Sequence, residues 1–410
     1  MNNVLFLSRF SNGNINSRPD TYTIWDSYKY GLEANIENII CEDYYDIYFS
    51  RGKKGFENHI EKLVSINNIK FLFIGFAAED FTFDVGFLLY LKQKYKLCMI
   101  HTSQDPETFF ECRDRYYNQL ADYVLPFTSI KNNCIYELYN ITAITLYSLY
   151  NKDMFQDKKL KKTIDVSFIG NVNKANRKEY INYLQDNGIA VQIYGPGSEN
   201  GFVSHMEMID IFNKSKINLN FTDSALSTYF DFNTNTNFTI GTYINSRIQQ
   251  AKGRLIEISL TNSFVLSQDG DGTRKLFDDD RIIFKTKEEL LKKINYYLEN
   301  SHERDTIAFD LYTQALEKYE AKNRFKEILP QLRYKSKSIN KIYIDKTFFK
   351  DYTSYHFLFL FNFLFKKKFN FVWQELKLAY QYRIFDTQTI YFHFRQQLNY
   401  AYKRYKGIKK

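Results

Sequence analysis

The sequence predicts an α/β protein with two parallel-sheet domains followed by a basic, mostly helical C-terminal extension. Short apolar runs alternate with helix-like segments, once within residues 1–155 and again within 160–330. Strands separated by helices favour parallel sheets with right-handed crossovers. The length of 410 residues suits two or three domains. The positive charge excess lies entirely in residues 331–410, which we therefore expect to form a separate extension.

Composition supports a globular protein. The chain is 44% hydrophobic and 18% aromatic, and it holds only 5 prolines and 16 glycines, which argues against a disordered or fibrous protein. The 4 cysteines have no metal-binding or redox spacing, so we expect buried thiols in a reducing cytosol. The first residues run directly into an apolar strand pattern, which predicts no signal peptide and a cytoplasmic location.

The first domain is predicted from five strands and three helices. The strands are expected at 4–8, 44–49, 69–76, 97–101 and 122–126, and the helices at 25–35, 56–66 and 83–94. The loop after the first strand contains Asn12-Gly13-Asn14, which can adopt positive φ angles. Neither GxGxxG nor GxxxxGK[ST] occurs, so the sequence supports no dinucleotide fingerprint and no P-loop.

Two polar residues follow the strand predicted at 97–101. His101 and Asp105 would lie at a sheet edge facing the second domain, and both are candidate catalytic residues. Each has a structural alternative. A single histidine at a strand end is more often structural, and an aspartate before proline commonly starts a turn.

The second domain repeats the pattern. Strands are expected at 165–171, 189–194, 215–221 and 263–267, with helices at 177–184 and 206–214. Gly170, Gly195 and Gly197 fall at strand ends, where the backbone must approach a ligand closely. Ligands of open parallel sheets bind outside the carboxyl ends of the strands. This edge is therefore the predicted ligand site.

The segment Lys252-Gly253-Arg254-Leu255-Ile256-Glu257 is the strongest candidate motif. In a helix, Arg254 and Glu257 are i,i+3 neighbours and project from one side. A cationic helix start suits a diphosphate, and a carboxylate suits a sugar diol. The alternative is an exposed ion pair on an ordinary helix, which contributes only a few tenths of a kcal/mol.

Four segments then occur in a recognisable order. They are DVSFIGNVNKANRKEYINYLQDNGIAVQIYGPG, KINLNF, KGRLIEISLTNSFVLSQ and KLFDDDRIIFKTKEELLKKINYYLENSHERDTIA. Over residues 165–326 the chain resembles the CgeB-like glycosyltransferases, within the group-1 glycosyltransferases of GT-B fold. The resemblance implies two Rossmann-like domains facing a cleft. It also implies a nucleotide-sugar donor held mainly by the second domain, and no obligatory metal or other cofactor.

The resemblance also assigns residues to the donor. Glu257 matches the glutamate expected to accept hydrogen bonds from the nucleotide ribose, and Lys252 and Arg254 match basic positions near the diphosphate. Gly170, Tyr194 and Gly195 match loops that pass under the phosphate and base, and Arg177 opens the helix beside them. Two positions depart from the family pattern. Gln249 stands where the group carries a glutamate, and Gln268 stands where an acidic residue is common.

The expected reaction moves a sugar from a nucleoside-diphosphate sugar to an acceptor hydroxyl in bacterial surface-glycan synthesis, with retention of configuration implied by the resemblance. Lys252, Arg254 and a helix N-terminus would stabilise the leaving diphosphate. The acceptor would enter near residues 12–16 and 101–105. Three alternatives stay open: a non-catalytic sugar-nucleotide or glycan-binding protein, a sugar-nucleotide epimerase, and a nucleic-acid-binding protein led by the extension.

Residues 331–410 carry 17 Lys and Arg against 4 Asp and Glu, a net charge of +13, whereas residues 1–330 carry −4. The first interpretation is attachment to an anionic membrane surface, at about 1 kcal/mol per basic residue near the lipid. Nucleic acid, an unlikely partner here, and a solvated helical appendage are the others. The apolar run 355–365 is shorter than the ~20 residues of a membrane span. It therefore fits interfacial insertion or a buried helix, with Lys366, Lys367 and Lys368 at headgroup level.

Overall fold

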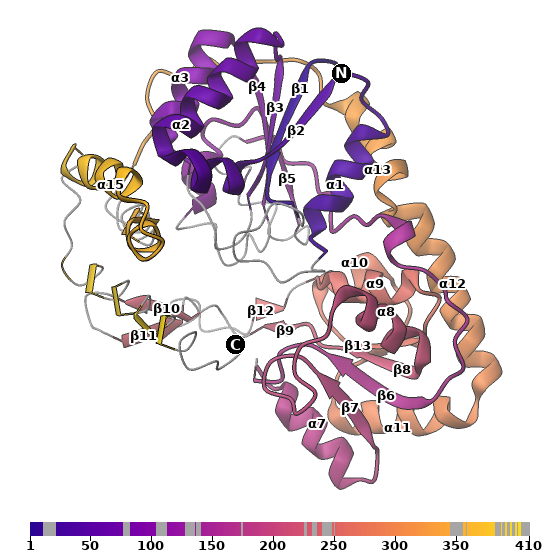
Figure 1. Cartoon of the computed structure of the whole chain (residues 1–410). Helices are drawn as coiled ribbons and strands as arrows, with labels where there is room; N and C mark the ends of the chain where they lie inside the picture. The colour runs from indigo at the N-terminus through magenta and orange to yellow at the C-terminus, as the bar shows by residue number, and fades with distance from the viewer. Residues whose placement is uncertain are drawn as a thin grey trace.

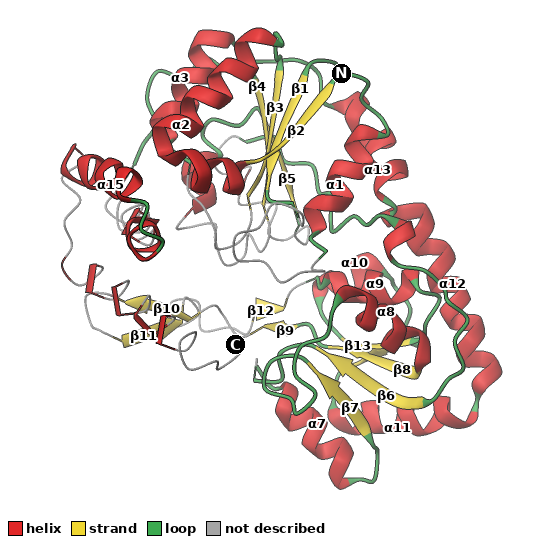
Figure 2. Ribbon diagram, viewed as in Figure 1, coloured by secondary structure: helices red, strands yellow, loops and turns green. Residues whose placement is uncertain are grey.

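The computed structural model contains two α/β domains (Figure 1), each a parallel sheet covered by helices (Figure 2). It describes residues 1–10, 22–76, 83–103, 113–127, 136, 141–173, 175–224, 228–231, 236–239, 248–249, 251–344, 356–357, 359–381, 387, 390–391, 394–395, 398–399 and 401–402. Within 224–249 and at 271 it describes the backbone alone. The predicted α/β class is confirmed.

The first sheet has the strand order β2-β1-β3-β4-β5, and every neighbouring pair is parallel. Its strands are β1 (Val4–Ser8), β2 (Ile39–Asp43), β3 (Phe71–Phe76), β4 (Cys98–Ser103) and β5 (Tyr123–Pro126). Its helices are α1 (Ile24–Glu33), α2 (Tyr44–Ile66), α3 (Val85–Tyr95) and the short α5 (Arg115–Tyr117).

Both faces of this sheet are buried. Along β1, Val4 and Phe6 join one hydrophobic core, and Leu5 and Leu7 join the other. Successive side chains of a strand point to opposite faces, so a run apolar at every position belongs to a strand covered on both sides.

The strand predicted at 44–49 is wrong, because these residues begin α2 and the strand is 39–43 instead. Asp43 caps the helix: its carboxylate accepts hydrogen bonds from the backbone N–H groups of Tyr45 at 2.9 Å and Asp46 at 3.0 Å. This cap satisfies helix-start donors and outweighs the β propensity of the aromatic residues that follow. The helix kinks at Gly52, whose φ of 70° is a conformation glycine adopts without strain.

The second sheet has the order β14-β13-β8-β6-β7, again all parallel. Its strands are β6 (Ile164–Ile169), β7 (Val191–Tyr194), β8 (Ser215–Asn220), β13 (Val265–Gln268) and β14 (Ile283–Phe284). Its helices are α7 (Arg177–Asp186), α8 (His205–Lys214), α9 (Gly253–Leu260), α10 (Asp271–Leu276) and α11 (Lys287–Glu299).

The two sheets share one topology. In each, the first strand lies between the second and the third, so the chain direction across the sheet reverses beside β1 and beside β6. Ligands of such sheets bind at this reversal, outside the carboxyl ends of the strands. Two small antiparallel pairs complete the strands: β9 (Asp223–Ser224) with β12 (Ile248–Gln249), and β10 (Thr228–Asp231) with β11 (Thr236–Thr239).

The domains are joined by two crossing segments. One contains the 3-10 turn η2 (Lys152–Met154), and the other runs through α12 (Ser301–Tyr319), α13 (Ala321–Ile328) and η4 (Leu329–Gln331). Tyr150 pairs with both sides of the α12–α13 junction through backbone hydrogen bonds of 3.0 and 2.9 Å. Helix α13 then packs on α1 of the first domain, with the Phe325 ring 5.3 Å from that of Tyr28 (Figure 1).

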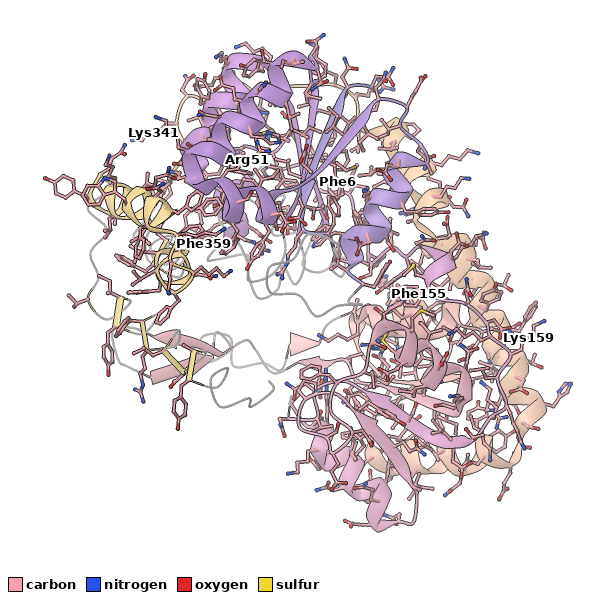
Figure 3. The ribbon with its side chains drawn as sticks, viewed as in Figure 1. Phe6, Arg51, Phe155, Lys159, Lys341 and Phe359 are labelled. Carbon is pink, nitrogen blue, oxygen red and sulfur yellow. The ribbon has the colours of Figure 1, made fainter. Side chains whose placement is uncertain are left out.

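The C-terminal extension packs on the first domain. Its described residues 332–344 form neither helix nor strand, whereas those from 356 onward are helical apart from a turn at 366–368, in agreement with the predicted mostly helical extension. The backbone N–H of Lys337 donates to Asp122 Oδ1 at 2.7 Å, and Gln119 makes two 2.9 Å hydrogen bonds with the backbone of Tyr343. Of the two alternatives for 355–365, the buried helix is the one observed: Phe359 and Phe363 are 2% and 0% exposed in the first domain's core (Figure 3). Helix α15 (Phe369–Gln381) follows and contacts α2.

A search of the described helices finds none that is both long and apolar enough to cross a bilayer.

Candidate functional site

The predicted phosphate loops meet at the carboxyl edge of the second sheet. Gly170 follows β6, and its backbone N–H donates to the carbonyl of Tyr194 at the end of β7, at 2.8 Å. Gly195 has a φ of 111°, and a Cβ atom there would lie 2.6 Å from the Gly170 carbonyl oxygen. Both the angle and the close approach require glycine at position 195. The two loops thus form one compact corner beside the point where the strand order reverses.

Arg177 opens α7 directly behind this corner. Its side chain is buried at 7% exposure, and Nη1 donates to the carbonyl of Asn171 at 3.0 Å. Its Nε is buried with no hydrogen-bond partner among the described residues. Burial, and then the nearby charge of Arg254, lower the pKa of Arg177 to about 10, although Asp223 partly opposes the shift. A buried cation with an unused donor beside a second cation is suited to an anionic ligand.

Helix α9 carries the cationic motif. Lys252 occupies its N-cap with φ −81° and ψ 126°, and Gly253 begins the helix. A Cβ atom at Gly253 would collide with the Tyr150 hydroxyl, so the domain junction itself requires glycine here. Arg254 and Glu257 form an ion pair, the structural alternative given for this motif, with Nη1 and Oε2 2.6 Å apart, although both side chains are partly buried rather than exposed. Arg254 also donates to the sulfur of Met208 and lies 5.5 Å from the centre of the Phe212 ring.

Glu257 lies where the two domains meet. Its charge contributes to the raised pKa of Tyr150, after the larger effect of burial, and to that of Tyr22. The Tyr22 ring comes from the first domain and lies 4.9 Å from His205 and 5.4 Å from Phe155. Figure 3 shows Phe155 at this junction. Burial lowers the pKa of His205, which keeps its ring neutral near pH 7. The sequence analysis missed this aromatic contact, because nothing in the sequence links Tyr22 to a residue more than a hundred positions later.

A second missed residue is Asp223, which follows β8 and is 3% exposed. Its carboxylate accepts hydrogen bonds from Asn176 Nδ2 at 2.9 Å and from Gln268 Nε2 at 3.1 Å. Gln268 also accepts from the Asp223 backbone N–H at 3.1 Å, so its departure from the family pattern has a structural role. The signal that could have found Asp223 is its position just after a strand at the ligand edge.

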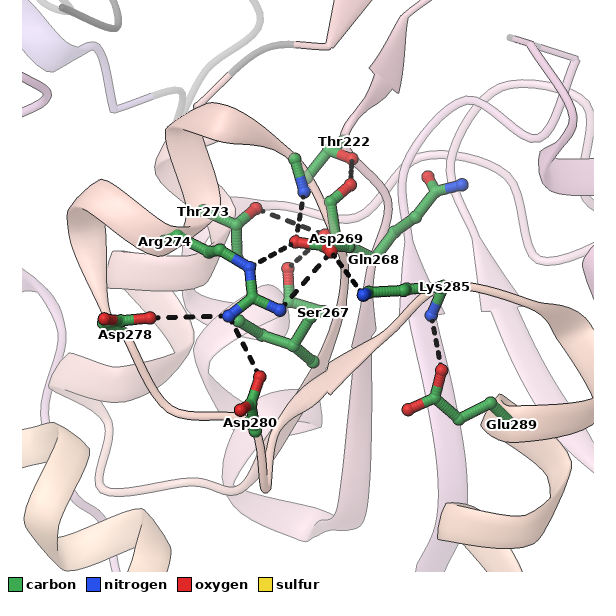
Figure 4. Close-up of polar contacts among 12 residues, drawn as sticks. Thr222, Ser267, Gln268, Asp269, Thr273, Arg274, Asp278, Asp280, Lys285 and Glu289 are labelled. Atoms are coloured by element: carbon green, nitrogen blue, oxygen red, sulfur yellow. Dashed lines mark hydrogen bonds and ion pairs between the residues drawn. The ribbon is translucent and has the colours of Figure 1, made fainter.

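The loop after β13 is fixed by a charge cluster around Arg274 (Figure 4). Arg274 lies 3.0 Å from Asp269 and 2.9 Å from Asp280, and Thr222 donates to the Asp269 carbonyl at 2.8 Å. These contacts anchor the loop that follows Gln268 and leads into α10. Arg274 is saturated by carboxylates, in contrast to Arg177.

Of the predicted first-domain residues, the structure describes His101, which lies in the interior of the first domain. His101 lies within β4 rather than after it, because the strand continues to Ser103. It is 1% exposed, and its Nδ1 lies 3.2 Å from Asn118 Oδ1. Burial lowers the pKa of His101 to about 3, so the ring is neutral at pH 7. Asp105 and residues 12–16 lie outside the described residues. The catalytic roles of His101 and Asp105 stay predictions.

No group of three or more His, Cys, Asp or Glu side chains able to hold a metal ion occurs in the part of the chain that the structure describes. Burial raises the pKa of Cys98 to about 11 and that of Cys41 to about 12, so both thiols are protonated at neutral pH.

Comparison with known proteins places the chain in a structural class. Residues 177–330 match the family model described as glycosyl transferase-like. The fold is similar to that of sucrose-phosphate synthase from Thermosynechococcus elongatus, with a TM-score of 0.54, 8% identity, and coverage of 81% of this chain and 99% of that one. It is also similar to HepE from Anabaena, solved in complex with UDP, with a TM-score of 0.54, 10% identity and the same coverage.

A glycosyltransferase from Rickettsia africae gives a TM-score of 0.51 at 12% identity, over 80% of this chain and 97% of that chain. No curated protein sequence gives a significant match. Identities this low establish the fold alone. The chain thus has the GT-B fold and carries a glycosyl transferase-like domain at residues 177–330.

Proposed function

We propose that the protein transfers a sugar from a nucleoside-diphosphate sugar to an acceptor hydroxyl, with the donor held at the carboxyl edge of the second sheet. The observation that carries the proposal is the environment of Arg177. Its side chain is buried near the positive charge of Arg254, and its Nε has no hydrogen-bond partner among the described residues. A diphosphate would supply the acceptor atoms and the negative charge that this arrangement lacks. The UDP named in the HepE structure, which has a similar fold, supports a nucleoside diphosphate as the ligand class.

The chemistry follows from the positions of the charges. The acceptor hydroxyl oxygen forms a bond to the anomeric carbon, and the bond between that carbon and the diphosphate oxygen breaks. The leaving diphosphate gains negative charge as it departs and takes up the proton that the hydroxyl releases. Arg254, Lys252 and the N-terminal end of α9 would stabilise that charge. Glu257 would accept the ribose hydroxyls, at about 1.5–3 kcal/mol per hydrogen bond to a charged group. Because Glu257 is already paired with Arg254, the donor would bind across an ion pair that holds both groups in place.

We further propose that the protein is of the CgeB-like type, acts in bacterial surface-glycan synthesis, retains the configuration of the sugar and needs no obligatory metal. These properties rest on the resemblance of residues 165–326 to the CgeB-like glycosyltransferases. We also propose that the basic residues of 331–410, with a net charge of +13, bring the protein to the cytoplasmic face of an anionic membrane, where lipid-linked acceptors are found.

A non-catalytic sugar-nucleotide-binding protein is the second candidate. The observation that favours it is His101, which is buried and paired with Asn118 rather than exposed at the ligand edge. A general base must reach the proton that it removes. Release of nucleoside diphosphate from a sugar nucleotide distinguishes the two, because a binding protein releases none.

The test is turnover of a sugar-nucleotide panel by the full chain, measured as nucleoside diphosphate released with and without glycan acceptors. We expect release from at least one donor, and Arg254→Gln should slow it by about 10²–10³-fold, the usual effect of removing one transition-state hydrogen-bond donor. Arg281→Gln is the matched control, because Arg281 is a half-exposed arginine of the same domain that pairs with Asp279 at 2.7 Å. Unchanged turnover in Arg254→Gln would contradict the assigned role.

A further inference from the structure

Among the described residues, helix α15 packs against the first domain through one face. On that face Glu375 and Ala379 are each 1% exposed, and the Phe371 ring stacks on Phe363 at 5.0 Å. Glu375 accepts a hydrogen bond from the Tyr48 hydroxyl at 2.8 Å and lies 2.6 Å from His356 Nδ1. These contacts fix the rotation of α15 about its axis against the first domain.

The opposite face of α15 is aromatic and open. Phe369, Trp373, Leu376 and Tyr380 are 64%, 61%, 38% and 78% exposed, at the spacing i, i+4, i+7 and i+11. At 100° per residue these four side chains lie within an arc of about 60°, and at 1.5 Å per residue they extend over about 17 Å. We call them the α15 stripe. Soluble surfaces rarely expose contiguous large apolar side chains unless these meet a partner.

Basic residues border the α15 stripe. Lys377 Nζ lies 5.7 Å from the centre of the Trp373 ring, and the exposed Lys367 precedes the helix. The neighbouring Lys366 and Lys368 face the first domain instead: Lys366 Nζ lies 5.3 Å from the centre of the Phe49 ring, and Lys368 Nζ donates to the Phe49 carbonyl at 3.4 Å. With a net charge of +13 over 331–410, the surroundings favour an anionic partner. A narrow apolar stripe flanked by lysines is typical of a helix that lies in a membrane interface, with its aromatic rings among the acyl chains and its lysines at the headgroups.

A similar helical spacing of partly exposed apolar residues occurs further along the extension, although its Phe394 ring also lies 5.4 Å from that of Phe361. Tyr391, Phe394, Leu398 and Tyr402 are helical at their own positions and are 64%, 39%, 44% and 55% exposed, at i, i+3, i+7 and i+11. Two successive stripes of this kind are more than the occasional exposed aromatic residue of an ordinary surface.

We propose that α15 lies flat in the interface of an anionic membrane, with Phe369, Trp373, Leu376 and Tyr380 inserted below the headgroups. This inference rests on the proposed membrane association and not on the donor site. It replaces 355–365 as the inserting segment, because Phe359 and Phe363 are buried in the first domain. A nucleic-acid partner fits less well, because Leu376 has no ring to stack on a base.

The chain contains its own reporter for the test. It has 2 tryptophans, of which Trp25 is 2% exposed in the first-domain core and Trp373 is in the stripe. The full chain is mixed with phosphatidylcholine vesicles that either contain or lack phosphatidylglycerol. We expect a blue shift of tryptophan emission and protection from acrylamide with the anionic vesicles only, together with co-sedimentation.

The double variant Phe369→Ser/Tyr380→Ser should partition at least tenfold more weakly, while Trp373 still reports. Phe202→Ser/Phe309→Ser is the matched control, since these aromatics are 52% and 58% exposed in the second domain, and it should partition like the natural sequence. Unchanged melting temperatures would show that neither double variant unfolds.

Other outcomes overturn the proposal in distinguishable ways. Co-sedimentation without a blue shift would mean that charge alone attaches the protein to the membrane, and would refute insertion of the α15 stripe. No sedimentation with either kind of vesicle would refute both the membrane association and the insertion. A blue shift produced by a single-stranded oligonucleotide but not by vesicles would assign the stripe to nucleic acid, and a stripe-dependent dimer that ignores vesicles would assign it to a second copy. A UDP-induced thermal shift tests the donor site separately in every case.

Discussion

Replacing Arg177 with methionine separates a donor-binding role from a structural one, because the two roles predict opposite effects on stability. Burial, the largest cause, lowers the pKa of Arg177 from its ordinary value to about 10 in the folded protein. At pH 7, which is below both the ordinary and the lowered pKa, Arg177 stays charged. The folded protein therefore carries the full free-energy cost of burying that charge. At 1.36 kcal/mol per pKa unit, this penalty is about 3 kcal/mol.

Two favourable contacts oppose this penalty. Arg177 donates to the Asn171 carbonyl at 3.0 Å, a hydrogen bond worth about 1.5 kcal/mol for a charged donor. Its guanidinium lies 5.7 Å from the centre of the Phe168 ring, a cation–π contact worth about 0.5–1 kcal/mol. Subtracting these two contacts from the burial penalty leaves about 1 kcal/mol, by which the folded protein with methionine should be more stable. The ligand-free Arg177→Met protein should therefore melt no lower than the natural sequence, and up to about 3 °C higher for a domain of this size.

The ligand-bound state should show the opposite effect. A nucleoside diphosphate at a hundred times its Kd stabilises the protein by about 2.7 kcal/mol, which is a clear thermal shift. Arg177→Met should lose most of that shift, because each charged hydrogen bond to the diphosphate is worth about 1.5–3 kcal/mol. The assay is a thermal-shift measurement with UDP, GDP and ADP on the full chain.

Arg304 provides the control. It is also buried in the second domain, at 5% exposure, but its Nη1 donates to the Tyr297 carbonyl at 3.0 Å and its Nε lies 3.3 Å from Asp305. Arg304→Met should melt lower than the natural sequence and keep the full nucleotide shift. The reasoning is refuted if Arg177→Met melts several degrees lower without ligand, or if it retains the nucleotide shift.

Three further predictions follow from the same structure. Glu257→Gln should raise the donor KM at least tenfold in steady-state assays, with an unchanged melting temperature; an unaltered KM would remove the ribose role. Burial lowers the pKa of His101 from its ordinary 6.5 to about 3 in the folded protein, so the stability that its neutral ring contributes above pH 6.5 is lost as the pH falls toward 3. Urea midpoints measured from pH 6.5 to 4 should therefore fall less steeply in His101→Gln, and an equally steep fall would argue against burial. Phe363→Ala should lower the free energy of unfolding by about 3–5 kcal/mol in denaturant titrations, because this ring is 0% exposed. Phe365→Ala, 40% exposed, should change it by less than about 0.5 kcal/mol, and equal effects would mean that the extension is not packed.

Most of the fold could be predicted from local patterns. The run 4–8 is apolar at four of its five positions, which is the pattern of a strand covered on both faces, whereas 165–171 and 215–221 mix apolar residues with short polar ones; strands form in all three. The prediction failed at 44–49, where the aromatic residues favour a strand. There the Asp43 cap and the packing of three tyrosines against the core stabilise a helix instead. Neither interaction is a property of residues 44–49 alone.

The candidate site likewise combines features that depend on local sequence with features that depend on long-range contacts. The Arg254–Glu257 pair is local, since an i,i+3 spacing fixes it wherever the helix forms. The pairing of Gly170 with Tyr194 is not local, because it depends on β6 and β7 lying side by side. The nearness of Tyr22 to Glu257 depends on how the two domains meet, and the hydrogen bonds of Asp223 to Asn176 and Gln268 depend on three separate loops.

The sequence by itself determined the class of the protein: two α/β units, a cationic helix start with a carboxylate one turn on, and a basic, aromatic extension. Each of these features follows from the spacing and charge of residues that are close together in the sequence. Only the tertiary structure decided which charges are buried, which aromatic residues are covered and which strand ends meet. Burial and desolvation depend on residues far apart in the chain, so the buried, unused Nε of Arg177 and the exposed aromatic face of α15 can be seen only in the assembled domains.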